Sequence, residues 1–99
     1  MSSKEERNDR VPSVCSDVVP VIPRSMYAEI VGTELTYHRR LRKLTQTEVA
    51  AKINVSPSTV SSIERGRMLP GIPMLFHLCA AIGISPTTVI SVVDETLNQ

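Results

Sequence analysis

The sequence predicts an all-α fold in which five short helices follow a flexible N-terminal arm. Apolar residues recur every three or four positions, which is the period of a helix with one buried face. A hydroxyl residue that can cap a helix precedes three of the expected helices, and glycine or asparagine follows where helices should stop. At 99 residues, the chain is long enough for one small core and too short for two.

The arm is assigned to residues 1–24 and the folded domain to residues 25–99. Three of the seven prolines lie in the arm, together with several serines and the mixed-charge stretch KEERNDR. This composition favours a flexible segment. The arm also carries many valines, which are unusual in disordered chains, so a strand or a packing arm remains the alternative.

The first helix is expected from about Met26 to near residue 43. Val31, Leu35 and His38 follow one another at helical spacing and would share one face. The second helix is expected at 46–53. It follows the stretch TQTE, a capping box in which the hydroxyl of the first threonine and the carboxylate of the glutamate satisfy backbone N–H groups.

Asn54 tolerates the left-handed conformation that often ends a helix, and it predicts the stop of the second helix. Ser56 caps a third helix, whose first turn takes Pro57 without losing a hydrogen bond. Gly66 ends this helix. Two helices of similar length joined by a short turn are typical of a helix-turn-helix, here spanning residues 46–65.

Two further helices complete the domain. The fourth begins at about Ile72 and stops at Gly83, while Ser85 and Pro86 repeat the cap-then-proline start for the fifth. The fifth helix has more apolar side chains than one core face can absorb. We therefore expect it to supply a dimer interface, for which the arm is the rival candidate; the interface residues are Val89, Ile90, Val93 and Leu97.

Charge is concentrated in the middle of the chain. The formal net charge is only +1, but residues 24–71 hold eight basic and four acidic residues. A central basic zone permits contact with DNA phosphates without proving it.

Several classes of function are disfavoured. No apolar run approaches the roughly 18–20 residues of a membrane span, so we expect a cytoplasmic protein with no membrane partner. Cys15 and Cys79 are far apart and His38 and His77 do not complete a ligand set, so no metal is predicted. No phosphate loop, activated nucleophile or carboxylate pair indicates an enzyme, and no cofactor is predicted.

The stretch from Gly32 to Val89 resembles the DNA-binding domain of Cro/CI-type repressors, also called the Xre family. The resemblance lies in Arg39, LTQTEVA at 44–50, NVSPSTVSSIERG at 54–66, Pro70 and LCAAIGIS at 78–85. It implies a lambda-repressor-like fold of five helices. It also implies a sequence-specific transcriptional regulator, here a repressor, that binds double-stranded DNA as a homodimer.

The resemblance assigns roles to individual residues. The face of helix 57–65 that meets base edges in the major groove would carry Pro57, Ser58, Ser61 and Ser62. Contacts with DNA phosphates are expected from Thr45, Gln46, Thr59, Arg65, Arg67 and Lys43, with Arg42 as a secondary candidate. Arg39 and Glu64 are expected to form a structural ion pair that fastens the first helix to the recognition helix.

The sequence departs from the family pattern at four positions. His38 replaces an aliphatic residue, and we expect a half-buried or buried histidine with a hydrogen-bond partner; a pH sensor is the alternative. Lys43 and Asn54 stand where glycines are common. Cys79 replaces a small core residue, for which packing is expected rather than redox sensing.

A second function remains open. The apolar arm would hold a protein partner in an antitoxin-like protein or a co-regulator, and DNA binding would then be secondary. The recognition helix itself is poor in long polar side chains. It lacks the arginine, glutamine or asparagine that make bidentate base contacts, so specificity is expected to depend strongly on DNA shape and half-site spacing.

Overall fold

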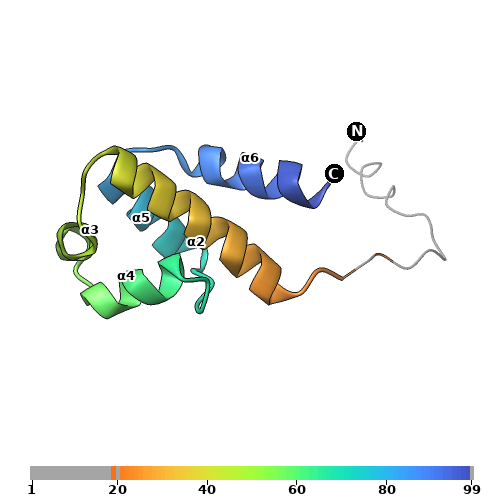
Figure 1. Ribbon diagram of the computed structural model, residues 1–99, viewed down its shortest axis with the longest axis horizontal. Helices are drawn as coiled ribbons and strands as arrows, with labels where there is room; N and C mark the ends of the chain where they lie inside the picture. The colour runs from red at the N-terminus through yellow and green to blue at the C-terminus, as the bar shows by residue number, and fades with distance from the viewer. Residues whose placement is uncertain (1–18, 20, 99) are drawn as a thin grey trace, which may run out of the picture.

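The fold is all-α, as predicted. The computed structural model describes residue 19 and residues 21–98, and no strand occurs among them. The five helices, labelled as in Figure 1, are α2 (Arg24–Leu41), α3 (Gln46–Ile53), α4 (Pro57–Glu64), α5 (Ile72–Ile82) and α6 (Pro86–Leu97). Most of the segment 1–24 lies outside the described residues, so its predicted flexibility stays a prediction.

The first helix begins two residues earlier than expected and ends two residues earlier. Pro23 is extended, with φ −60° and ψ 143°, and its carbonyl accepts the first turn's hydrogen bond from Met26 N at 3.0 Å. Proline has no N–H to satisfy and its φ suits a helix start, which explains why α2 begins directly after it. The early end has a different cause, in the conformation of Lys43.

The turns after α2, α3, α4 and α5 close in the same way. In each, one residue has a left-handed backbone, and the next residue donates its N–H to a carbonyl five positions back. The left-handed residues and their φ angles are Lys43 (58°), Asn54 (60°), Gly66 (76°) and Gly83 (93°). This arrangement satisfies carbonyl groups that a helix end would otherwise leave free. Each helix is therefore stopped by the residues that follow it.

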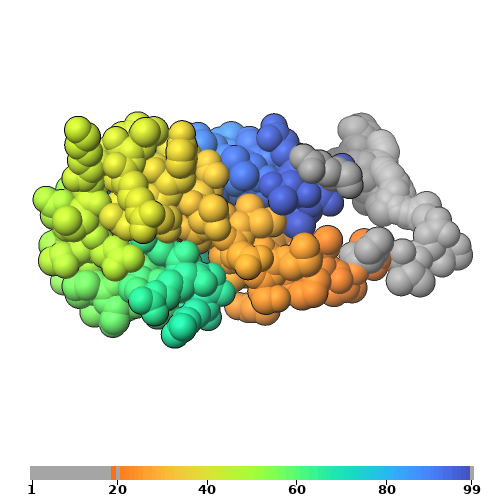
Figure 2. All heavy atoms as spheres, in the orientation of Figure 1, coloured from red at the N-terminus to blue at the C-terminus, as the bar shows by residue number. Residues whose placement is uncertain are grey.

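α2 crosses the middle of the molecule and organises the other helices. α3 and α4 lie at one end of it, and α6 runs along its other side (Figure 1). In the space-filling view, the green surface of α4 lies beside the yellow and orange surface of α2 (Figure 2). All five helices contribute to one aliphatic core, whose most deeply buried members are Leu35, Val49, Val60, Ile63, Leu78, Cys79 and Val89.

Gly32 allows α2 and α4 to approach closely. A Cβ atom built on Gly32 would clash with the carbonyl oxygen of Ile63 and would lie 2.7 Å from that of Glu64. Both atoms belong to the backbone of α4 and cannot turn aside as a side chain would. The position of the recognition helix on α2 thus depends on the absence of a side chain at residue 32.

The predicted dimer face on α6 needs a correction. Val89 is 0% exposed and belongs to the core, because it points inward between the helices rather than toward solvent. Val93 packs partly against the same core. Ile90 is 48% exposed, and Leu97 lines an open groove with Ile22 and Tyr27.

Within the described part of the chain, no single helix is both long and apolar enough to cross a membrane. α5 and α6 reach the required length and hydropathy only as a pair, and they are bent by 116° where they join.

Candidate nucleic-acid interface

The start of α3 is fixed by a complete capping box. Glu48 N donates to Thr45 Oγ1 at 3.0 Å, and Thr45 N donates to Glu48 Oε1 at 2.8 Å. Thr45 Oγ1 acts as an acceptor in this pair, so its hydroxyl hydrogen is free to donate to an incoming ligand. The first-turn N–H groups of a helix favour an anion, which suits the predicted phosphate contact of Thr45.

A carboxylate joins three helices beside this helix start. Arg39 of α2 donates to Glu64 of α4 through two nitrogens: Nε to Oε2 at 2.7 Å and Nη2 to Oε1 at 3.0 Å. Gln46, the first residue of α3, donates through Nε2 to Glu64 Oε1 at 2.9 Å. The third arginine donor, Nη1, bonds to the carbonyl of Leu44 at 2.6 Å. The ion pair that the resemblance implied is thus present, and it is bidentate.

The protonation of Glu64 follows from these contacts. Burial raises the pKa of Glu64, but the hydrogen bonds from Arg39 and Gln46 and the charge of Arg39 outweigh it, so the pKa is lowered overall. The carboxylate is therefore ionised at neutral pH. Because its charge is matched by a guanidinium, it does not present a bare negative group to DNA phosphates.

Gln46 was expected to contact a phosphate, and in the structure its side chain contacts Glu64 instead. One amide hydrogen is used in that bond and the second remains, since a primary amide has two. Glu64 also fixes which end of the amide faces inward. This contact was missed at the sequence stage of the argument because 18 positions separate the two residues.

The outward face of α4 carries the four residues that the resemblance assigned to base edges. Pro57 and Ser58 are exposed, whereas Ser61 and Ser62 are half-buried. Ser56 Oγ accepts from Thr59 N at 3.2 Å and lies 3.0 Å from the hydroxyls of both Ser58 and Thr59. Three hydroxyl groups therefore cluster at the start of the helix, while Val60 and Ile63 hold its inner face.

The cations around α4 lie on different sides. Arg65, Arg67 and Lys43 are exposed, and among the described residues none of them forms an ion pair. Arg67 lines a groove with Arg24, a residue that the sequence prediction did not include. Arg42 lies elsewhere, because its Nε would be 3.5 Å from a Cβ on Gly83, in the turn between α5 and α6. We therefore withdraw Arg42 as a candidate phosphate contact.

Two departures from the family pattern have structural explanations. His38 is half-buried, and its Nε2 lies 3.0 Å from Glu34 Oε2, one helical turn away. Cys79 is fully buried in the core, where burial raises the pKa of its thiol. Packing is the role that its position supports, as expected.

The fold and this surface together define a helix-turn-helix DNA-binding domain. Residues 35–89 match the helix-turn-helix family HTH_3, and the chain belongs to this family. It is a helix-turn-helix transcriptional regulator of the Xre type.

Individual relatives agree with this assignment. The chain is 38% identical over 68 residues to the uncharacterised HTH-type transcriptional regulator y4dJ of Sinorhizobium fredii, covering 69% of this chain and 88% of that protein. It is 37% identical over 67 residues to the immunity repressor protein of Bacillus phage phi105, covering 68% of this chain but only 45% of the repressor. Among solved structures, the clp gene regulator ClgR of Corynebacterium glutamicum superposes with a TM-score of 0.69 at 29% identity, covering 77% and 81% of the two chains.

Proposed function

We propose that this protein is a repressor that binds an operator as a homodimer, with α4 in the major groove of each half-site. The observation that carries this proposal is the state of Glu64. A carboxylate at the end of a DNA-facing helix would repel phosphates, and here Arg39 and Gln46 neutralise and satisfy it. The cations that remain free are exposed at the edges of the same helix.

The contacts fall into two groups. Pro57, Ser58, Ser61 and Ser62 would meet base edges, because they form the face of α4 opposite Val60 and Ile63. Phosphate contacts would come from the start of α3 and from the edges of α4, through Thr45, Gln46, Thr59, Arg65, Arg67 and Lys43. Serine hydroxyls are short and allow a close approach, so DNA shape and half-site spacing should supply much of the specificity.

Selection of bound sequences from random DNA tests this proposal. The full chain should enrich an inverted repeat whose half-sites are about one helical turn apart. Affinity for the selected duplex should then fall steeply with salt. Recovery of no common sequence, at any salt concentration that supports binding, would contradict a sequence-specific regulator.

The homodimer is proposed on grounds of scale and exposed apolar surface. One short helix reads few base pairs, whereas two half-sites multiply the discrimination. Ile90 on α6 is the exposed apolar residue nearest the groove formed by α6, Tyr27 and residues 19–22. We place the centre of the dimer contact at Ile90, with Val93 and Leu97 at its edge.

Sedimentation velocity of variants distinguishes the two candidate surfaces. Ile90→Glu should give a monomer, while Ile72→Glu, which changes an equally large exposed side chain at the start of α5, should leave the dimer intact. Deletion of residues 1–23 should also leave the dimer intact. Loss of the dimer in the deletion variant alone would move the interface to the arm.

The second candidate, an antitoxin-like protein or co-regulator, is supported by the exposure of the segment that precedes α2. Val19 is 77% exposed and Val21 is 90% exposed, which is unusual for adjacent apolar residues. A protein that co-purifies with the full chain from native cells, and not with the variant that lacks residues 1–23, would favour this function.

A further inference from the structure

We propose that Arg40 is a further contact with the DNA backbone and extends the interface from α4 onto α2. The inference rests on the proposed DNA-binding function and adds a residue that the sequence resemblance did not assign. It places one phosphate of the bound strand beside α2, next to the point where Arg39, Gln46 and Glu64 meet.

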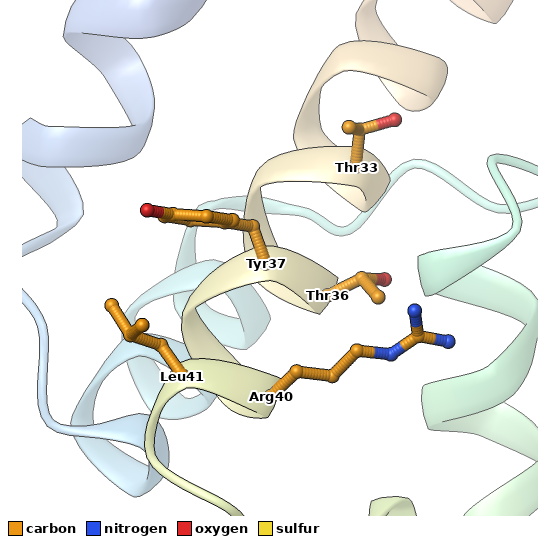
Figure 3. Close-up of a pocket in the computed structure, with 5 residues that line it drawn as sticks. All are labelled: Thr33, Thr36, Tyr37, Arg40 and Leu41. Carbon is orange, nitrogen blue, oxygen red and sulfur yellow. The ribbon is translucent and has the colours of Figure 1, made fainter.

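The position of Arg40 on α2 is the first argument. Arg40 lines an open groove with Thr33, Thr36, Tyr37 and Leu41. Figure 3 shows that Arg40 and Thr36 point to the side of α2 where α4 lies, whereas Tyr37 and Leu41 point to the other side. Thr36 also donates its hydroxyl to the carbonyl of Gly32 at 2.8 Å, and Gly32 is where α2 touches the backbone of α4. The Arg40 side chain therefore reaches along the border between the two helices.

The electrostatic surroundings are the second argument. Arg40 is exposed, and within residues 21–98 it has neither an ion pair nor a side-chain hydrogen bond. The carboxylate on the adjoining part of α4 is Glu64, and that group is engaged by Arg39 and Gln46. Arg40 is thus left with its full set of donors. A guanidinium presents these donors in a planar fork that suits a phosphate group.

The neighbouring arginine shows that this placement is not a general property of the basic stretch. Arg42 is two residues further along α2 and lies against Gly83, in the turn between α5 and α6. Residues two apart on a helix point in widely different directions. Arg40 and Arg42 therefore carry the same charge at nearly the same height on α2, but only Arg40 borders α4.

Salt-dependent DNA binding tests the proposal with Arg42 as the matched control. The full chain and its variants are titrated with two labelled duplexes of about 24 base pairs, one selected by the wild type and one unrelated, between about 0.05 and 0.3 M NaCl. Arg40→Ala should reduce the log–log salt slope by about 0.9 and the affinity by about eightfold at 0.1 M salt. Both duplexes should lose affinity by a similar factor, because a phosphate contact carries no sequence information.

Two variants keep the test independent of folding. Arg40→Gln retains the stem without the charge and should change the slope as Arg40→Ala does, whereas Arg40→Lys should restore it. Arg42→Ala should leave the slope unchanged. A wild-type slope in both Arg40→Ala and Arg40→Gln would overturn the proposal while leaving the DNA-binding function in place. Wild-type protein that binds neither duplex would instead overturn the proposed function. A loss of binding to an acidic protein partner, with normal DNA slopes, would assign Arg40 to a protein contact.

Discussion

Gln46 and Glu64 connect the first residue of α3 to the last residue of α4 through a hydrogen bond of 2.9 Å between Nε2 and Oε1. The same carboxylate receives Arg39 from α2, so one side chain ties three helices together. The two helices of the motif are joined by a short turn at one end, and this network joins them at the other. The angle between them is therefore fixed at both ends.

Removal of the arginine should destabilise the domain strongly. The Arg39 and Glu64 side chains are only 9% and 5% exposed, so Arg39→Met leaves a nearly buried carboxylate without a cation. Loss of one partner from a buried pair costs about 3–5 kcal/mol. Urea unfolding should show this loss. The double variant Arg39→Met/Glu64→Met should recover much of it, and equal instability of the single and double variants would argue against the ion pair as the cause.

The stability that Glu64 contributes should depend on pH. Its pKa in the folded protein is lowered from the ordinary value of 4.5, so the contribution is present above pH 4.5 and is lost as pH falls through the folded pKa. Glu64→Gln cannot show this dependence. The difference between the urea midpoints of wild type and Glu64→Gln should be largest near neutrality and should shrink in acid. If this substitution changes neither the melting temperature nor operator affinity, the structural role of Glu64 is wrong.

A methyl group at residue 32 should push α4 away from α2. Gly32→Ala places its Cβ against two backbone carbonyls, and overpacking of this kind costs about 1–3 kcal/mol despite the better helix propensity of alanine. Gly71→Ala is the control, since its Cβ would meet only Pro73 Cδ at 3.9 Å. Thermal unfolding should separate the two variants. Equal melting temperatures would show that the helices can separate at little cost.

Lys43→Gly should raise stability and weaken DNA binding together. Lys43 has φ 58°, a conformation that costs a residue with a side chain about 1–2 kcal/mol, partly offset in glycine by its freedom in the unfolded chain. We expect a gain of about 0.5–1 kcal/mol in the free energy of unfolding and a loss of about 0.9 in the salt slope. Asn54→Gly, also at positive φ, should gain less and leave the slope unchanged. A destabilised Lys43→Gly variant would contradict the strain argument.

Single serine substitutions on α4 should reduce discrimination only modestly. Ser58 already shares a hydrogen bond with Ser56, and Ser62 has no side-chain hydrogen bond within the described residues. Neither side chain can make the bidentate contacts worth about 1–3 kcal/mol each. Competition between the selected duplex and random DNA should therefore change less than tenfold for Ser58→Ala or Ser62→Ala. Abolished discrimination in each variant would show that direct readout dominates.

Helix positions were predictable because their signals are local. Thr45, Ser56 and Ser85 cap the helices that follow them, and Asn54 and Gly83 stop the helices that precede them. The early end of α2 was not predicted, since lysine is not a usual residue for a left-handed backbone. Its conformation at Lys43 becomes evident only from the structure.

The parts that were wrong or missing depend on which way a side chain points in three dimensions. Val89 and Ile90 are adjacent and both apolar, yet one is in the core and the other is exposed, because α6 turns about 100° per residue. Arg40 and Arg42 differ for the same reason. Their directions relative to α4 and α5 require the packing of the helices, which the sequence pattern leaves open.

The ends and inner face of α4 are set by residues that do not face outward. Ser56 and Gly66 fix its limits, and Val60 and Ile63 attach it to the core. Ser61 and Ser62 take part in neither. New side chains at these two positions would therefore alter what the helix recognises at little expense to folding. Such a division of labour leaves the chain open to reprogramming, in evolution or in the laboratory, toward other DNA targets.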